Sequence, residues 1–295
     1  MKILIIGGNR YFGKRLATRS LQAGHQVTLL NRGHHEDGLG SSVERLQCDR
    51  SNAQALQKAV GHRSWDLVYD QVCFEAQDAR AAIKIFRGRT AHYVFTSSQS
   101  VYGPGAGLQE SAFEPTAHKF SKEETRHSDY AEAKRQCEAV FFQTQDFPVT
   151  AVRFPLVLGA DDSSGRLPWH VERIRTKKPL YFPNLSARIS MVSSEDAARV
   201  LESLGKMSAQ GPLNAASENP IKLADFVSVL EKAIAQRSLL AETPSDETHS
   251  PYGISEDWFM DTSQLRGLGI KLRPIQDWLQ EELVKYDLQN PKPRI

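Results

Sequence analysis

Residues 2–15, with the sequence KILIIGGNRYFGKR, decide the fold of this chain. A short apolar run breaks directly into glycines, and a helical pattern follows that ends at Gly24. A strand-to-helix turn of this kind directs backbone N–H groups and a helix N-terminus at one spot, which suits a phosphate. Gly7 allows the tight turn, and Gly13 lets the helix pack closely on the strand. A second apolar strand at 26–30 completes a βαβ unit, so the stretch predicts a dinucleotide-binding fold.

Apolar runs and helical patterns alternate through the first half of the chain. Strands are expected at 2–6, 26–30, 43–47, 66–70, 91–96 and 149–154, and helices at 11–23, 52–60, 75–86 and 129–145. This alternation predicts an α/β fold of the Rossmann type, a doubly wound parallel sheet covered by helices on both faces.

After residue 155 the alternation becomes less regular. Helices are expected at 165–176, 194–205, 222–236 and 274–288, short strands at 179–182, 189–192 and 211–215, and a loop at 240–256. We therefore expect an NAD(P)-binding domain at 1–155 and a smaller α/β substrate-binding region at 156–295, with substrate in the cleft between them. This division leaves room for elements of the second region to return to the first sheet.

Composition narrows the class of protein. Of 295 residues, 40% are hydrophobic and 24% charged, the balance of a globular protein with a sizeable core. The net charge of +2 argues against a nucleic-acid or membrane partner. The three cysteines lie far apart, which is typical of reduced thiols in a cytoplasmic protein, and no metal site is expected. The N-terminal apolar run is too short for a signal peptide, and no stretch is long enough to span a bilayer.

Three residues carry the candidate chemistry. Tyr130 and Lys134 lie four positions apart on an expected helix, so the phenol and the ammonium group share a face. A phenol has an ordinary pKa of about 10, and a nearby cation lowers that pKa. Ser98 follows the strand at 91–96, at the carboxyl edge where ligands bind in such sheets. The order and spacing of the three predict a reaction centre beside a dinucleotide.

With these residues the chain resembles the extended short-chain dehydrogenase/reductase superfamily, specifically the NAD-dependent epimerase/dehydratase group. The resemblance rests on Gly7 to Gly13, the SQSVYG segment at 98–103, Tyr130-x-x-x-Lys134, and the later segments 153–159, 188–198 and 261–279. It implies that Tyr130 is the general acid/base, that Lys134 holds the nicotinamide ribose, and that Ser98 bonds to the reacting oxygen.

The resemblance also implies which residues contact the cofactor and the substrate. Expected cofactor contacts are Gly7, Asn9, Arg10, Tyr11, Phe12, Gly13, Asn31, Arg32, Asp49, Arg50, Gln71, Val72, Cys73, Phe74, Ser97, Tyr130, Lys134 and Pro155. Expected substrate contacts are Ser98, Ser100, Tyr102 and Arg188. A homodimer through the helices at 75–86 and 129–145 is a further expectation from the family.

The turn departs from the family pattern in a way that bears on the cofactor. Arg10 occupies the position of the middle glycine, and the second strand ends in Asn31-Arg32 without an acid. An acid there selects NAD, whereas an arginine accommodates the additional phosphate of NADP. Arg10 and Arg32 together could bind a 2′-phosphate, so we expect NADP, with NAD as the alternative. His34 and His35 in the next loop are interpreted as solvated residues.

The main hypothesis is an NAD(P)-dependent oxidoreductase, epimerase or dehydratase acting on a hydroxyl or carbonyl group of a small molecule, a nucleotide-linked sugar. Two alternatives stay open. The turn, with its short link between strands four and five, is similar to an atypical subgroup that includes plastid proteins binding RNA stem-loops. That similarity fits a non-catalytic nucleotide-sensing or RNA-binding relative. A ketone or imine reductase of a biosynthetic pathway instead predicts a cleft lined by apolar side chains from 155–192.

Overall fold

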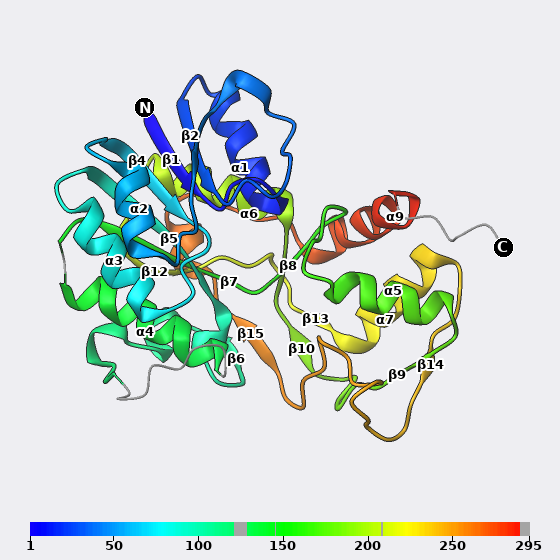
Figure 1. Cartoon of the computed structure of the whole chain (residues 1–295). Helices are drawn as coiled ribbons and strands as arrows, with labels where there is room; N and C mark the ends of the chain where they lie inside the picture. The colour runs from blue at the N-terminus through cyan, green and yellow to red at the C-terminus, as the bar shows by residue number, and fades with distance from the viewer. Residues whose placement is uncertain (121–128, 145, 208, 290–295) are drawn as a thin grey trace.

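The computed structural model describes residues 1–120, 129–144, 146–207 and 209–289 (Figure 1). Its centre is a seven-stranded parallel sheet with the strand order β12-β7-β5-β4-β1-β2-β3. The strands are β1 (Lys2–Ile6), β2 (Gln26–Asn31), β3 (Glu44–Gln47), β4 (Trp65–Asp70), β5 (Thr90–Ser98), β7 (Val149–Phe154) and β12 (Gly211–Asn214).

Helices cover both faces of this sheet, because its strands are apolar on both sides. In β1, Ile3 and Ile5 belong to the core on one face, and Leu4 and Ile6 belong to the core on the other. The first face packs against α1 (Tyr11–Gln22) and α6 (Ser194–Gly205), and the second against α2 (Ala53–Val60), α3 (Ala76–Phe86) and α4 (Tyr130–Thr144). The expected Rossmann-type, doubly wound α/β fold is confirmed.

A second lobe has its own apolar core around the fully buried Trp278 (Figure 1). Its helices are α5 (Arg166–Arg175), α7 (Leu223–Ile234) and α9 (Leu279–Gln289), whereas the short α8 (Ser263–Gly267) packs with its Leu265 in the core of the first sheet. A small mixed sheet has the order β13 (Ile221–Lys222), β10 (Arg188–Ile189), β15 (Trp258–Met260) and β6 (Gly105–Leu108). Two further pairs join β8 (Leu156–Leu158) to β11 (Met191–Ser193) and β9 (Pro179–Leu180) to β14 (Leu239–Leu240).

Several elements differ from expectation. The strand expected at 189–192 is divided between two sheets, because Ser190 leaves the strand path and its hydroxyl accepts the N–H of Met260. Strand β6 was not expected. Helix α9 begins only at Leu279, after a 3₁₀ turn, whereas the sequence pattern suggested a start at residue 274. Within the described ranges, no helix has the length and apolar character that a bilayer crossing requires.

Candidate active site

Two cavities adjoin at the carboxyl ends of the sheet strands, where open α/β sheets bind ligands. The first, of about 630 Å³, lies against the glycine turn and the ends of β2, β3 and β4. The second, of about 530 Å³, lies between the end of β5, the start of α4 and the second lobe. Tyr11, Phe12, Gln71 and Phe74 line both cavities, which therefore form one continuous crevice.

The glycine turn has the geometry of a phosphate cradle. Gly7 has a φ of +88°, which favours glycine, and donates its N–H to Leu30 over 2.9 Å. At Gly13 an added Cβ would lie 2.2 Å from Oε1 of Gln71 and 3.1 Å from the carbonyl oxygen of Gly7, so a larger residue would displace the Gln71 side chain. No side chain caps the N-terminus of α1, and its first turn contains no acid. Its first N–H groups are thus free to bind an anion.

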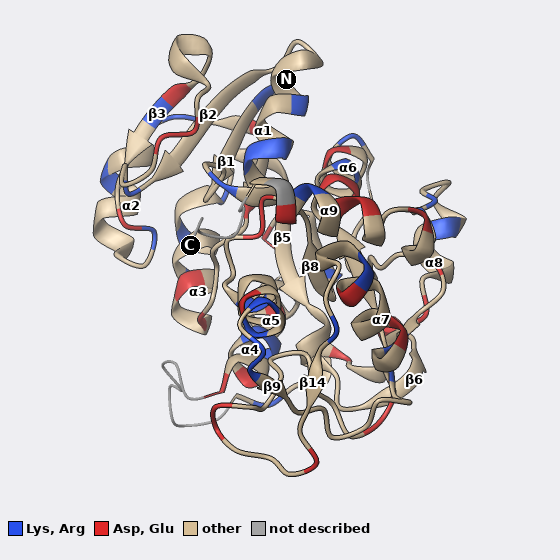
Figure 2. Cartoon of the chain, turned by 90° about the vertical axis from the view of Figure 1, so that its right-hand side faces the viewer, with Lys and Arg blue, Asp and Glu red and all other residues tan. Residues whose placement is uncertain are grey.

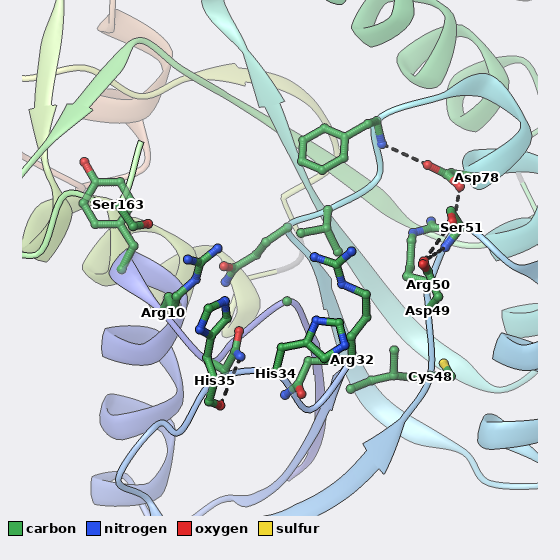
Figure 3. Close-up of a pocket in the computed structure, with 18 of the residues that line it drawn as sticks. Arg10, Arg32, His34, His35, Cys48, Asp49, Arg50, Ser51, Asp78 and Ser163 are labelled. Carbon is green, nitrogen blue, oxygen red and sulfur yellow. Dashed lines mark hydrogen bonds and ion pairs between the residues drawn. The ribbon is translucent and has the colours of Figure 1, made fainter. Parts of the chain in front are cut away.

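Four basic side chains border the first cavity. Arg10, Arg32, His34 and His35, here called the basic rim, all line it (Figure 3). Figure 3 shows the guanidinium groups of Arg10 and Arg32 turned into the same space, with the two imidazoles beside them. Among the described residues, neither arginine has an ion-pair partner. The histidines are exposed, as expected, but they also line the cavity, which sequence reasoning missed.

Asn9, Asn31, Asp49 and Val72 also line the first cavity, as expected. Hydrogen bonds from Ser51 to the carboxylate lower the pKa of Asp49.

Two of the expected cofactor contacts have other partners. The guanidinium of Arg50 is buried and bound to Asp70, with Nη2–Oδ2 at 2.5 Å and Nε–Oδ2 at 3.0 Å, so Arg50 shapes the cavity wall. Cys73 is fully buried and lines neither cavity; its carbonyl oxygen instead accepts a hydrogen bond from Lys134.

The second cavity brings together Ser98, Tyr130 and Lys134. The buried Lys134 donates from Nζ to the carbonyl oxygens of Cys73 (2.8 Å) and Thr96 (2.9 Å). An ammonium group has three donors, so one N–H remains for a ligand. Tyr130 is 52% exposed, and its ring centroid lies 5.8 Å from Nζ of Lys134. The hydroxyl of Ser98 accepts the N–H of Ser100 over 3.2 Å. An accessible phenol beside a fixed cation can exchange a proton.

A buried ion pair supports the strand that carries Ser98. Arg153 is fully buried and donates to both carboxylate oxygens of Glu138, at 3.0 and 2.6 Å. Ser97, an expected cofactor contact that lines the second cavity, donates its hydroxyl to the same carboxylate over 2.5 Å. Glu138 lies one turn after Lys134 on α4. The pair therefore ties the end of β5 to the helix that carries Tyr130.

Two of the four expected substrate contacts line the second cavity, and two do not. Ser98 and Ser100 line the second cavity, but Tyr102 and Arg188 do not. Tyr102 is buried, accepts from Arg153 and donates to Asn214, each over 2.7 Å; burial raises the pKa of Tyr102 to about 12.

Sequence reasoning missed a wall of the second cavity. Pro251, Tyr252, Gly253, Ile254 and Trp258 line it, and four of these belong to the segment expected to be a plain loop. Tyr252 is held from behind, because its ring stacks on the buried His170 with centroids 4.7 Å apart. An aromatic residue between Pro251 and Gly253 was the available signal, since apolar rings in loops are often buried.

Buried polar atoms without a hydrogen-bond partner gather at the second cavity. Among the described residues that line it, these atoms are Tyr11 OH, Gln71 Nε2, Thr96 Oγ1, Gln99 Oε1, Ser100 Oγ, Tyr252 OH and Trp258 Nε1. A buried polar group left unsatisfied costs about 1–3 kcal/mol, so such groups gather where a ligand or water completes them. This concentration marks the cavity as a binding site.

Comparisons with known proteins agree with this geometry. The model of the NAD dependent epimerase/dehydratase family matches residues 3–214. The chloroplast stem-loop binding protein of 41 kDa b from Arabidopsis thaliana is 24% identical over 207 residues, which cover 65% of this chain and 51% of that protein. The bifunctional pinoresinol-lariciresinol reductase 2 from Linum usitatissimum is 46% identical over 46 residues, 16% of this chain and 13% of that protein. The chain thus matches about half the length of the chloroplast protein.

Solved structures share the fold over almost the whole chain. UDP-glucose 4-epimerase from Bifidobacterium longum, in complex with NAD+ and UDP, has a TM-score of 0.73 at 14% identity and covers 99% of each chain. UDP-glucuronic acid 4-epimerase from Bacillus cereus, in complex with NAD, has a TM-score of 0.74 at 17% identity, with 99% of this chain and 100% of that chain covered. At these identities the likeness establishes the fold.

Proposed function

The chain belongs to the NAD-dependent epimerase/dehydratase family, and on that premise we propose that it is an NAD(P)-dependent oxidoreductase, epimerase or dehydratase acting on a hydroxyl or carbonyl group. The observation that carries the proposal is the meeting of Ser98, Tyr130 and Lys134 in a cavity continuous with the phosphate cradle. The residues fit the cofactor, because the cradle, the free N-terminus of α1 and the unpartnered Nε2 of Gln71 face this crevice.

Each residue of the reaction centre has a distinct role. Bound NAD(P) supplies or accepts a hydride. Tyr130 transfers the proton of the reacting hydroxyl, and its exposed phenol can reach a substrate in the cavity. Ser98 donates a hydrogen bond to the reacting oxygen. Lys134 is fixed by two carbonyl groups, so its remaining N–H would be available to hold the nicotinamide ribose.

The cofactor is NADP, with NAD as the alternative. The basic rim and the absence of an acid after β2 support this choice, since Asn31 uses its Oδ1 to accept the N–H of Gly33. A charge-assisted hydrogen bond contributes about 1.5–3 kcal/mol. Arg32→Ala should therefore weaken NADP binding at least tenfold and leave NAD binding nearly unchanged. Calorimetric titration of both cofactors checks this, and equal weakening of the two would contradict the 2′-phosphate role.

Two substrate classes remain in the proposal. A nucleotide-linked sugar is the class that the epimerase names suggest, since the Bifidobacterium enzyme is described with UDP. A ketone or imine reductase is favoured by one specific observation, because Leu156, Val157 and Ile189 give the second cavity an apolar wall.

An RNA-binding role, suggested by the name of the Arabidopsis protein, is the non-catalytic alternative. Figure 2 shows Asp and Glu interspersed with Lys and Arg on the side in view, where RNA binding would favour a continuous basic face.

Tyr130→Phe tests the catalytic proposal. Carbonyl compounds and nucleotide sugars are first screened with the wild-type protein and NADPH or NAD+ for a change in cofactor absorbance. With the best substrate, the variant should lose about 10²–10⁴-fold in turnover, the usual contribution of a general acid/base. Its NADP dissociation constant should stay unchanged. Wild-type turnover in the variant, or salt-resistant binding of a stem-loop RNA by a protein that binds neither cofactor, would refute the proposal.

Two further expectations stay predictions. A homodimer through α3 and α4 would bring Arg80, Lys84 and Arg87 of two copies together, because all three are exposed on or just after α3. Light scattering at varied salt tests it. A cytoplasmic location rests on the cysteines; Cys73 and Cys137 are free thiols whose sulfur atoms lie 3.9 Å apart.

A further inference from the structure

The second cavity has walls and charges that narrow its substrate class. We propose that it binds a compact, mostly apolar carbonyl or alcohol substrate carrying one anionic group, which Arg166 holds, and not a nucleoside diphosphate sugar. The inference rests on the proposed function, because it takes Ser98 and Tyr130 as the end at which the substrate reacts.

The walls favour an apolar ring. Ile189 and Trp258 are paired across β10 and β15, so their side chains share the face of the small sheet that lines the cavity. Leu156 and Val157 line it from β8, and Tyr252, which belongs to the core of the second lobe, also lines it. An aromatic or aliphatic ring placed there would be removed from water at about 25 cal/mol for each Å² buried. A diphosphate gains nothing from such walls.

The cations are few. Among the described residues that line the cavity, Lys134 and Arg166 carry positive charge, and Lys134 already donates to two carbonyl oxygens. The guanidinium of Arg166 lies 5.7 Å from the ring centroid of Tyr252, and its Nε contacts the hydroxyl of Ser164 at 3.2 Å. No described carboxylate forms an ion pair with it. Its terminal N–H groups form the planar fork that matches one carboxylate.

The arginine expected to bind a substrate anion has another use. Arg188 donates to Oδ2 of Asp257 from Nη2 at 2.6 Å and from Nε at 3.0 Å, and its guanidinium lies over the ring of Phe259. It does not line the cavity. A diphosphate in this cavity would therefore meet one unengaged guanidinium, which suits a single charge better than two.

The remaining polar groups are neutral. The amide Nε2 of Gln99 donates to the carbonyl oxygen of Trp258 over 2.8 Å, which fixes the direction of its Oε1. That Oε1 and the indole Nε1 of Trp258 are both buried and unpartnered. A hydroxyl group can both donate and accept, so hydroxyl groups of a ligand can complete either atom from within the cavity. Such a pair specifies a polar but uncharged part of the substrate.

Calorimetry on the Tyr130→Phe protein loaded with oxidised NADP, which has no hydride to transfer to a ketone, tests the inference. The probes are para-acetylbenzoate, its uncharged isostere para-acetylbenzamide, and UDP-glucose. We expect para-acetylbenzoate to bind about tenfold more tightly than either of the others, because one charge-assisted hydrogen bond contributes about that factor or more. Adding Arg166→Gln should abolish the preference for the charged ketone. The matched control Lys178→Gln, which removes an exposed charge just beyond α5, should leave it intact.

Each contrary result is distinguishable. Tighter binding of UDP-glucose than of para-acetylbenzoate, or no saturable binding of para-acetylbenzoate, overturns the substrate class. If Arg166→Gln weakens NADP binding and leaves the ketone preference intact, the arginine serves the cofactor and the inference fails. NADP and NAD are titrated beforehand with the wild-type protein. A protein that binds neither cofactor refutes the proposed function itself, and a thermal melt of each variant shows that it is folded.

Discussion

Protonation of His170 should weaken the fold and the wall of the second cavity as the pH falls from 7 to 5. The ring is fully buried between Arg166 and Tyr252 on the inner side of α5. Its Nδ1–H donates to the carbonyl oxygen of Arg166 over 2.7 Å, since a carbonyl can only accept. Its Nε2 then accepts the hydroxyl of Ser250 over 2.8 Å. Burial of this neutral ring lowers the pKa of His170 to about 4.

The direction and size of this pH effect follow from the pKa of His170 in the folded and in the unfolded chain. Between pH 4 and the ordinary pKa of about 6.5, the unfolded chain binds a proton at His170 that the folded chain does not. The stabilisation is therefore complete above pH 6.5 and is lost as the pH falls toward 4. Lowering the pH from 7 to 5 costs about 2 kcal/mol at 1.36 kcal/mol per pH unit. With an unfolding entropy of about 2.1 cal/mol/K per residue, Tm falls by about 3 °C.

Thermal unfolding of the wild type and His170→Gln at pH 7 and pH 5 measures this. Glutamine supplies a donor and an acceptor but does not titrate. Any stability that the substitution itself removes is therefore measured at pH 7, separately from the pH effect. Other titrating groups, including His92, whose pKa burial also lowers, are common to both proteins and cancel in the difference. The Tm of the wild type should fall about 3 °C further than that of the variant. Equal falls in the two proteins would refute the reasoning.

Three further changes have definite expected outcomes. Glu138→Gln removes the charged partner of the buried Arg153 and should cost about 3–5 kcal/mol in urea unfolding, with loss of turnover; a cost below about 1 kcal/mol would contradict a shared support for β5 and α4. Gly13→Ala places a Cβ 2.2 Å from Oε1 of Gln71 and displaces that side chain, which lines both cavities. NADP binding should weaken up to about tenfold in a fluorescence titration, the contribution of one hydrogen bond, whereas unchanged affinity would mean that Gln71 does not contact the cofactor. Tyr252→Phe removes a hydroxyl that has no partner among the described residues, so the free energy of unfolding should change by less than about 0.5 kcal/mol. Binding of para-acetylbenzoate should weaken in calorimetry. A large loss of stability would show that the hydroxyl has a partner in the fold.

Local pattern was enough to predict the first sheet and the proximity of Ser98, Tyr130 and Lys134, which line one cavity. The register of β1 follows from alternate burial on two faces, and the glycine turn places α1 directly after it. Tyr130 and Lys134 lie on one helix, and Ser98 ends the strand that this helix covers. Their meeting thus depends on a single strand–helix neighbourhood, which short-range spacing can predict.

The helices α5 and α7 of the second lobe lie where the sequence pattern places them, but its strands and its cavity wall could not be predicted in this way, because distant segments build them. Strand β6 exists only because Gly105 and Leu108 find β15 about 150 residues later. Tyr252 and Trp258 enter the cavity through contacts with α5 and β10, and nothing in their own neighbourhood specifies those partners. Strands this short show little alternation of apolar and polar residues, so the sequence pattern does not reveal them.

Internal partners separate binding residues from structural ones among the candidates. Arg50, Tyr102 and Arg188 each have the chemistry of a ligand contact, yet each is already bound within the chain. Arg50 is bound to Asp70, Tyr102 to Asn214, and Arg188 to Asp257. Tyr11 is the opposite case. It has a strained φ of +54°, its buried hydroxyl has no hydrogen-bond partner among the described residues, and it lines both cavities. We propose on this ground that the Tyr11 side chain contacts a ligand where the two cavities join.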